Sequence, residues 1–180
     1  VKAAVDTFGS IDVIVNNGQA IVPSAPVEDT TYENMLAAWQ SGTIGSLNYM
    51  QAAFPYMKEQ HEGRIINFAS ATGMFGIAGQ LAYGSNKEAL RGLTKIAAKE
   101  WGQYGICVNV VLPGAESPAA KAWAEKFPEE YQKQVMLNPM HRFGDPEDDI
   151  APVVAFLAGP DSCYYSGQSV IVDGANSIMP

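Results

Sequence analysis

The chain has 180 residues, of which 47% are hydrophobic, and its formal net charge at pH 7 is −8. This length fits one domain with a sizeable core. No apolar run approaches the roughly 18 residues that a membrane-spanning helix needs. The negative charge argues against nucleic acid and anionic membrane surfaces as partners.

The cysteines and histidines give no indication of a metal site. Cys107 lies in an apolar run and Cys163 in a polar loop, and their spacing does not suit a metal. His61 and His141 have no metal-binding neighbours in the sequence. Two isolated cysteines favour a reducing compartment, so the sequence predicts a cytoplasmic protein without a metal.

Strand and helix patterns alternate along the chain. Four short, branched apolar runs are predicted to be strands covered on both faces, as in a parallel sheet: residues 11–16, 64–69, 106–112 and 169–172. Helices are predicted in the segments between them: residues 32–58, 83–104, 118–135 and 146–158. The alternation predicts an α/β fold with a doubly wound parallel sheet. Pro55 is expected to kink or shorten the first helix.

The most informative segment is residues 68–87 (FASATGMFGIAGQLAYGSNK), which leaves an apolar run through Ser70 and opens a helix. Tyr83 and Lys87 are four residues apart, so both side chains are expected on one helical face. A nearby ammonium favours the phenolate and lowers a tyrosine pKa, which makes Tyr83 a candidate proton donor and acceptor. Ser70 could hydrogen-bond the oxygen that gains or loses the proton. This pattern is typical of a carbonyl–alcohol redox site.

Four further motifs accompany this segment in a fixed order. They are residues 12–18 (DVIVNNG), 107–114 (CVNVVLPG), 142–148 (RFGDPED) and 166–174 (SGQSVIVDG). Together with the segment around Tyr83, they resemble the classical short-chain dehydrogenase/reductase family over essentially the whole chain. The resemblance implies a Rossmann-like domain, of which this chain is the C-terminal portion. It also implies an NAD(P)(H)-dependent oxidoreductase that interconverts a secondary alcohol and a ketone.

The resemblance assigns roles to the catalytic residues. It implies that Tyr83 transfers the proton, that Lys87 lowers the tyrosine pKa and holds the nicotinamide ribose, and that Ser70 orients the substrate oxygen. The alternative is that none of the three has a catalytic role: a half-buried tyrosine, a surface lysine and a serine at a strand end.

The family motifs also mark cofactor-binding residues beside Tyr83 and Lys87. These are Asn16, Asn17 and Gly18 at the end of a strand under the cofactor, Pro113 and Gly114 at the nicotinamide face, and Ser117 as a substitute for a threonine. Asparagine at a strand end can instead be a simple turn former.

Three positions depart from the family pattern. Gln19 places an amide where the backbone usually runs close to the cofactor. Gly42 falls where the family usually has an asparagine that helps to continue the proton path, so we expect an altered relay and a slower or specialised enzyme. Pro118 stands at the position of the carboxamide-binding threonine.

Apolar residues after Ser70 and after Ser117 predict a substrate pocket for a fairly apolar small molecule. The candidates are Ala71, Met74, Phe75, Trp123 and Phe127. Aromatic and methionine residues at helical spacing are also compatible with an ordinary core.

The glycine-rich turn that cradles a dinucleotide pyrophosphate is not found in the sequence. Compared with the family, two βα units and a further strand are expected upstream, on the order of 60–80 residues at ~30 residues per unit. The domain at residues 1–180 is therefore expected to be N-terminally incomplete. Three explanations remain open: an N-terminal segment missing from the sequence, a shortened gene product, or a natural minimal protein.

The missing turn also leaves the choice between NAD and NADP open. The resemblance implies a homotetramer in which the long helices at 32–58 and 83–104 pair across subunits. Two other functions remain open. One is a catalytically inactive scaffold or partner-dependent fragment without cofactor binding, and the other is non-redox chemistry such as elimination or epimerisation.

Overall fold

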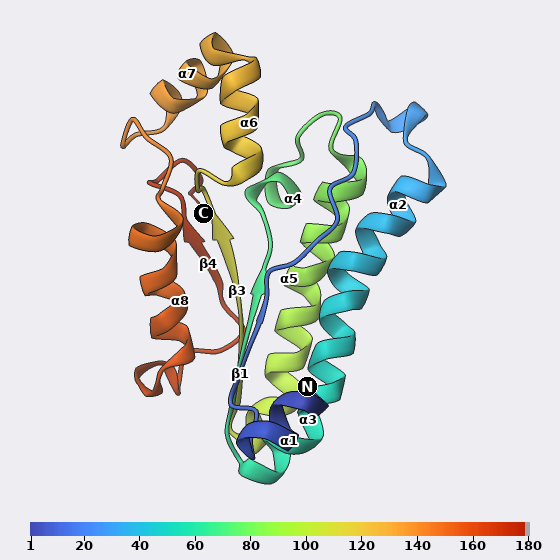
Figure 1. Cartoon of the computed structure of the whole chain (residues 1–180), viewed down its shortest axis with the longest axis vertical. Helices are drawn as coiled ribbons and strands as arrows, with labels where there is room; N and C mark the ends of the chain where they lie inside the picture. Colours follow the sequence, from blue (N-terminus) through green and yellow to red (C-terminus); the bar gives the residue numbers. More distant parts are fainter. Residues whose placement is uncertain (179–180) are drawn as a thin grey trace.

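Four short strands form a parallel sheet in the computed structural model, which describes residues 1–178 (Figure 1). Its order is β1–β2–β3–β4, with bounds Val13–Asn16, Gly63–Phe68, Ile106–Pro113 and Ser169–Val172. Each strand falls within two residues of its predicted position. Because all strand pairs are parallel, their carboxyl ends meet at one edge of the sheet, where open α/β folds bind ligands.

Helices cover both faces of the sheet, which confirms the doubly wound α/β architecture (Figure 1). The helices α2 and α3 follow one another end to end and pack beside α5 on one face, while α8 covers the other and α6 and α7 lie beyond the carboxyl ends of the strands. The α-helices are α1 (Lys2–Phe8), α2 (Tyr32–Trp39), α3 (Gly45–Gln60), α4 (Ala71–Phe75), α5 (Leu81–Trp101), α6 (Pro118–Lys126), α7 (Pro128–Leu137) and α8 (Ala151–Ala158). None of the helices among residues 1–178 has the length and apolarity to cross a membrane.

The first long helix is interrupted at a different place from the one predicted. A π-helical turn at Gln40–Ile44 separates α2 from α3, whereas α3 continues through Pro55 to Gln60. The expectation that Pro55 shortens this helix is therefore wrong, while the alternative of a kink at Pro55 stays a prediction. Ala53 and Met57, on either side of the proline, are fully buried, and this packing holds the helix together across it.

Two other predicted helices are also divided. The segment at 118–135 breaks at Phe127, whose φ of −137° and ψ of 66° lie outside the helical region. Pro128 follows directly, and a proline disfavours the helical conformation of the residue before it. The segment at 146–158 begins with a π-helical turn, Pro146–Ile150, before α8 starts at Ala151.

The core lies on both faces of the sheet because neighbouring strand residues point in opposite directions. Ile65 packs with Met50 and Met57 of α3, and Ile66 packs with Leu157 of α8. All five side chains are at most 1% exposed. Strands covered in this way read as continuous apolar runs, which is why the sequence located them accurately.

Gly105 makes the tight connection from α5 into β3. Its φ is +73°, and a Cβ atom there would lie 2.2 Å from the carbonyl oxygen of His61. Both the backbone angle and the available space therefore require glycine at this position.

We expect Gly105→Ala to lower the free energy of unfolding by about 2–5 kcal/mol, the sum of a left-handed backbone conformation and an overpacked contact. Urea denaturation followed by circular dichroism measures this change. Gly102→Ala is the matched control, because no atom lies within 4 Å of its added Cβ and alanine there is expected to be neutral or slightly stabilising. Equal stability of the two variants would contradict the prediction.

Candidate active site

A cleft of about 720 Å³ lies at the carboxyl edge of the sheet and brings Ser70, Tyr83 and Lys87 together. It is formed by the ends of β2 and β3, the start of α5 and the loop after β1. The residues that line it are Asn17, Gln19, Ala20, Ile21, Val22, Ser24, Phe68, Ala69, Ser70, Gln80, Tyr83, Lys87, Pro113, Ala115 and Ser117.

Ser70 is positioned by the turn from β2 into α4. It is the N-terminal cap of α4, and its Oγ accepts a hydrogen bond from the backbone N–H of Thr72 at 3.2 Å. Serine is a preferred residue at this position because its side chain satisfies an unpaired N–H of the first turn. The same contact fixes the hydroxyl at the wall of the cleft.

Tyr83 and Lys87 lie one turn apart on α5, as their spacing predicted. The Nζ of Lys87 is 5.6 Å from the centroid of the Tyr83 ring. It donates a hydrogen bond of 2.7 Å to the carbonyl oxygen of Phe68, the last residue of β2. This bond ties α5 to β2 and thereby brings Tyr83 toward Ser70.

The pKa of Tyr83 does not shift in the expected direction. Burial raises it from its ordinary value of 10.0, and the hydrogen bond with Ser70 opposes this rise. The sequence predicted a lowered pKa because it placed a cation nearby but could not reveal the desolvation of the phenol. Loss of contact with water disfavours the charged phenolate.

Burial also lowers the pKa of Lys87, from 10.5 to about 8. The side chain is only 5% exposed, and it forms no ion pair with any residue in the described part of the chain. An ammonium group in such surroundings loses hydration that no opposite charge replaces. Lys87 therefore titrates close to physiological pH.

The predicted cofactor-binding residues divide into two groups. Asn17, Pro113 and Ser117 line the cleft, and Ser117 also caps α6 by accepting from the N–H of Ala120. Asn16 instead joins β1 to β2 through a hydrogen bond of 2.8 Å from its Nδ2 to Oδ1 of Asn67.

The predicted glycines lie beside the cleft without lining it. Gly18 is exposed in the loop after β1. Gly114 packs so closely against Asp173 that an added Cβ would lie 2.6 Å from the Cβ of that residue. Their assignment to a cofactor site stays a prediction.

None of the five predicted substrate-pocket residues lines the cleft. Met74 packs against the core, and Trp123 contacts the ring of Tyr131. Phe75 and Phe127 are 55% and 41% exposed, and Ala71 lies in the first turn of α4. A role for them in covering a bound substrate stays a prediction. Apolar lining comes instead from Ile21 and Val22, in a loop that sequence reasoning did not consider.

Sequence reasoning also missed Asn86, whose side chain is completely buried. Its amide occupies the space beside Gly42, where an added Cβ would lie 2.2 Å from the Nδ2 atom. Asparagine is an unfavourable residue in a helix interior, and its place directly before Lys87 was an available signal.

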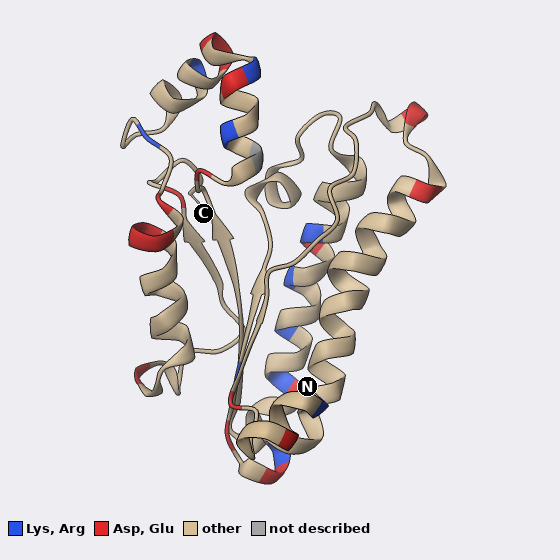
Figure 2. Ribbon diagram, in the orientation of Figure 1, with Lys and Arg blue, Asp and Glu red and all other residues tan. Residues whose placement is uncertain are grey.

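The cleft carries little charge. Among its lining residues within the described chain, Lys87 alone is charged. Acidic residues gather elsewhere, for example at the turn that precedes α8 (Figure 2), where Glu147, Asp148 and Asp149 favour the helix dipole.

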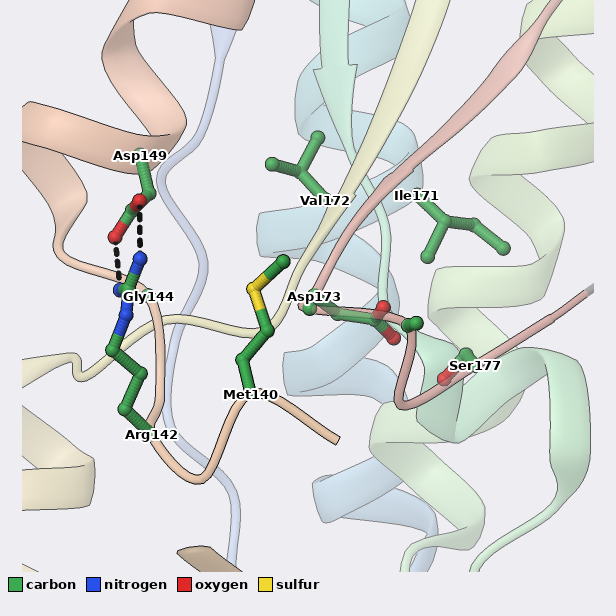
Figure 3. A pocket seen from close by; sticks show the side chains of 10 residues that line it. Met140, Arg142, Gly144, Asp149, Ile171, Val172, Asp173 and Ser177 are labelled. Atoms are coloured by element: carbon green, nitrogen blue, oxygen red, sulfur yellow. Dashed lines mark hydrogen bonds and ion pairs between the residues drawn. The ribbon is translucent and has the colours of Figure 1, made fainter. Parts of the chain in front are cut away.

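A second pocket, of about 340 Å³, lies between the segment after β4 and the Arg142 region (Figure 3). Arg142 pairs with Asp149 at its rim, while Met140 and Asp173 face its interior. No group of three or more metal-binding side chains occurs anywhere in the described residues.

Comparison with known proteins identifies the family to which this fold and this cleft belong. Residues 1–175 match the model of a family described as enoyl-(acyl carrier protein) reductase, and the chain belongs to the short-chain dehydrogenase/reductase family.

Two curated relatives match nearly the whole chain. The chain is 40% identical over all its 180 residues to a 12α-hydroxysteroid dehydrogenase from a Clostridium species, covering 69% of that protein. It is 35% identical to a diacetyl reductase ((S)-acetoin forming) from Staphylococcus aureus, covering 97% of this chain and 70% of that protein.

A solved structure also resembles the chain closely. It is described as ElxO with NADP bound and superposes with a TM-score of 0.90 at 28% identity. The match covers 97% of this chain and 71% of that one.

The lowered pKa of Lys87 gives a testable pH dependence of stability. Between pH 8 and 10 the unfolded lysine still binds its proton while the folded one has largely lost it. Stability rises with pH wherever the unfolded state binds more protons, and Lys87 contributes about 2 kcal/mol of such a rise across this window. The raised pKa of Cys107 acts in the opposite direction and is common to the wild type and the variants.

We expect Lys87→Met to remove this rise, with urea denaturation at several pH values as the measurement. Lys95→Met, on the same helix at an exposed position, is the control and should keep the rise. The raised pKa of Tyr83 acts only near and above pH 10, where it opposes stability. Identical pH profiles of wild type and Lys87→Met would contradict the prediction.

Proposed function

We propose that this protein is a nicotinamide-dependent oxidoreductase that interconverts a secondary alcohol and a ketone. The observation that carries the proposal is the meeting of Ser70, Tyr83 and Lys87 in one cleft at the carboxyl edge of a parallel sheet, in a chain of this family. Both curated relatives support it, because their names describe the oxidation of an alcohol or the reduction of a ketone.

The chain's own residues handle the proton. Tyr83 donates a proton to the substrate oxygen during reduction and accepts it during oxidation, since its hydroxyl faces the cleft beside that of Ser70. Ser70 hydrogen-bonds the same substrate oxygen and holds it in place. As long as Lys87 is protonated, its ammonium group stabilises negative charge on the Tyr83 oxygen.

A nicotinamide cofactor, when bound, supplies the hydride chemistry. The residues of the cleft suit its ribose and carboxamide, because Lys87, Asn17 and Ser117, which all line it, offer N–H and O–H donors. Pro113 adds an apolar surface of the kind that an aromatic ring contacts. The likeness to a structure with bound NADP supports nicotinamide dinucleotides as a class, and both NAD and NADP fit the proposal.

The substrate in this proposal is an uncharged, fairly apolar alcohol or ketone. Ile21 and Val22 provide apolar lining, and Lys87 alone among the described lining residues is charged. Ile21 is 89% exposed, so an apolar substrate at the mouth of the cleft would cover a side chain that water now surrounds.

Tyr83→Phe tests the catalytic proposal. We expect the turnover number to fall roughly 10²- to 10⁴-fold, the usual contribution of general acid–base catalysis, while cofactor binding persists. Oxidation of a 12α-hydroxysteroid and reduction of diacetyl, followed by the absorbance of the reduced nicotinamide, are the assays. Tyr164→Phe is the control because Tyr164 is fully exposed.

Retained turnover in Tyr83→Phe would remove Tyr83 from the mechanism. Wild-type protein that neither binds a dinucleotide nor oxidises or reduces any test substrate would favour the scaffold function instead.

A homotetramer belongs to the same proposal. Tyr49 on α3 and Ile96 on α5 are 59% and 60% exposed, and exposed apolar side chains on neighbouring helices are typical of an interface between subunits.

We expect size-exclusion chromatography with light scattering to give four times the chain mass for the wild type. Ile96→Glu should give a smaller species, because the introduced charge would be buried without a partner. Lys99→Glu on the same helix, at an exposed position, controls for the added charge. A wild type that elutes as a monomer would contradict the tetramer.

A further inference from the structure

A backbone N–H and two side chains form a chain of hydrogen bonds from the π-helical turn to the cleft. The Oδ1 atom of Asn86 accepts from the backbone N–H of Thr43 at 2.8 Å, and its Nδ2 donates to Oε1 of Gln19 at 3.0 Å. Asn86 is completely buried. Gln19 lines the cleft together with Ser70, Tyr83 and Lys87.

The partners in this chain fix the orientation of both amides. A backbone N–H can only donate, so the atom of Asn86 that faces Thr43 must be its oxygen. Nitrogen Nδ2 of Asn86 therefore faces Gln19, and the atom of Gln19 that receives it must also be oxygen. The amide nitrogen of Gln19 is consequently directed away from Asn86.

That nitrogen, Nε2 of Gln19, is buried and has no hydrogen-bond partner among the described residues. A buried donor without an acceptor is unfavourable, because it has lost water without gaining a partner. Gln19 lines the cleft and its neighbours Gly18 and Ala20 are exposed, so the nitrogen belongs to a side chain that a ligand in the cleft would contact. An acceptor that arrives there with a ligand removes the cost.

Gly42 makes the arrangement possible. A Cβ atom at this position would lie 2.2 Å from Nδ2 and 2.6 Å from Oδ1 of Asn86, so any other residue would displace that amide. The backbone around Gly42 forms the π-helical turn, a feature that is frequent at functional sites.

We propose that Gln19 is a ligand-binding residue whose amide nitrogen donates a hydrogen bond to an uncharged oxygen of the ligand in the cleft, and that Asn86 and Gly42 are positioning residues that hold this amide. The inference rests on the proposed oxidoreductase function. The acceptor is a hydroxyl or carbonyl oxygen, carried either by the dinucleotide or by the substrate. A neutral donor suits such an oxygen better than a phosphate, which favours charged donors.

Gln19→Glu is the sharpest test. The introduced carboxylate still accepts from Asn86 but presents an acceptor where the donor was. Gln19→Met removes the donor without adding charge. Titration calorimetry with NADH and with NADPH measures the dinucleotide arm, and the KM for diacetyl measures the substrate arm.

We expect both variants either to bind the dinucleotide roughly ten- to hundredfold more weakly or to show a KM for diacetyl that is higher by the same factor. This is the effect of losing one hydrogen bond in a closed site. A loss of dinucleotide affinity assigns the acceptor to the cofactor, and a rise in KM alone assigns it to the substrate. Gln103→Glu, exposed in the 3₁₀ turn after α5, controls for the charge and should change neither value.

The results separate this inference from the proposed function. Variants that match an active wild type in both arms overturn the role of Gln19 and leave the oxidoreductase intact. A wild type that neither binds a dinucleotide nor turns over diacetyl overturns both.

Gly42→Ala tests the positioning role. We expect Gly42→Ala to impair the same value as Gln19→Met, either the affinity for the dinucleotide or the KM for diacetyl. The double variant should be impaired no further than Gln19→Met alone, because both changes act through one amide. Fully additive losses, or no loss in Gly42→Ala, would overturn the positioning role. Gly92→Ala, a helical site with no atom within 4 Å of the added Cβ, is the control.

Discussion

The hydrogen bond from Lys87 to the carbonyl oxygen of Phe68, 2.7 Å long, is the contact on which the candidate site depends. It fastens the start of α5 to the end of β2. Ser70 follows Phe68 by two residues, and Tyr83 precedes Lys87 by one helical turn. Fixing this one pair of atoms therefore brings both hydroxyl groups to the same cleft. The parallel sheet makes the contact possible by ending β2 and β3 at one edge.

The same contact has a cost in stability. An ammonium that is 5% exposed exchanges most of its hydration for a neutral carbonyl, and its pKa falls to about 8 as a result. Folded proteins retain such conflicts mainly at functional sites. The partly buried phenol of Tyr83 and the unpartnered amide nitrogen of Gln19 lie around the same cleft. Three polar groups in unfavourable surroundings thus lie around the proposed catalytic cleft. The sheet and the flanking core provide the apolar burial that stabilises the fold.

The sequence predicted regular elements better than their interruptions. Ile65 and Ile66 belong to a run that reads as a strand because both faces of the sheet are covered. The break at Phe127 was also accessible, since Pro128 restricts the residue before it. The π-helical turn around Gly42 was only partly accessible: glycine loosens a helix, but the buried amide of Asn86 that packs beside it comes from another helix. Pro55 did not end the helix as a proline usually does, because the packing of its neighbours holds α3 together across it.

By itself, the sequence determined the α/β class, the positions of the strands along the chain and the family, and it singled out Ser70, Tyr83 and Lys87 as the candidate set that the cleft brings together. These follow from local patterns and from fixed spacings, both of which are visible in the sequence itself. Only the tertiary structure decided the direction of the pKa shift of Tyr83 and the orientation of Gln19. Both depend on which atoms exclude water or supply a donor from distant parts of the chain, and neither burial nor hydrogen-bond direction is encoded in the spacing of residues.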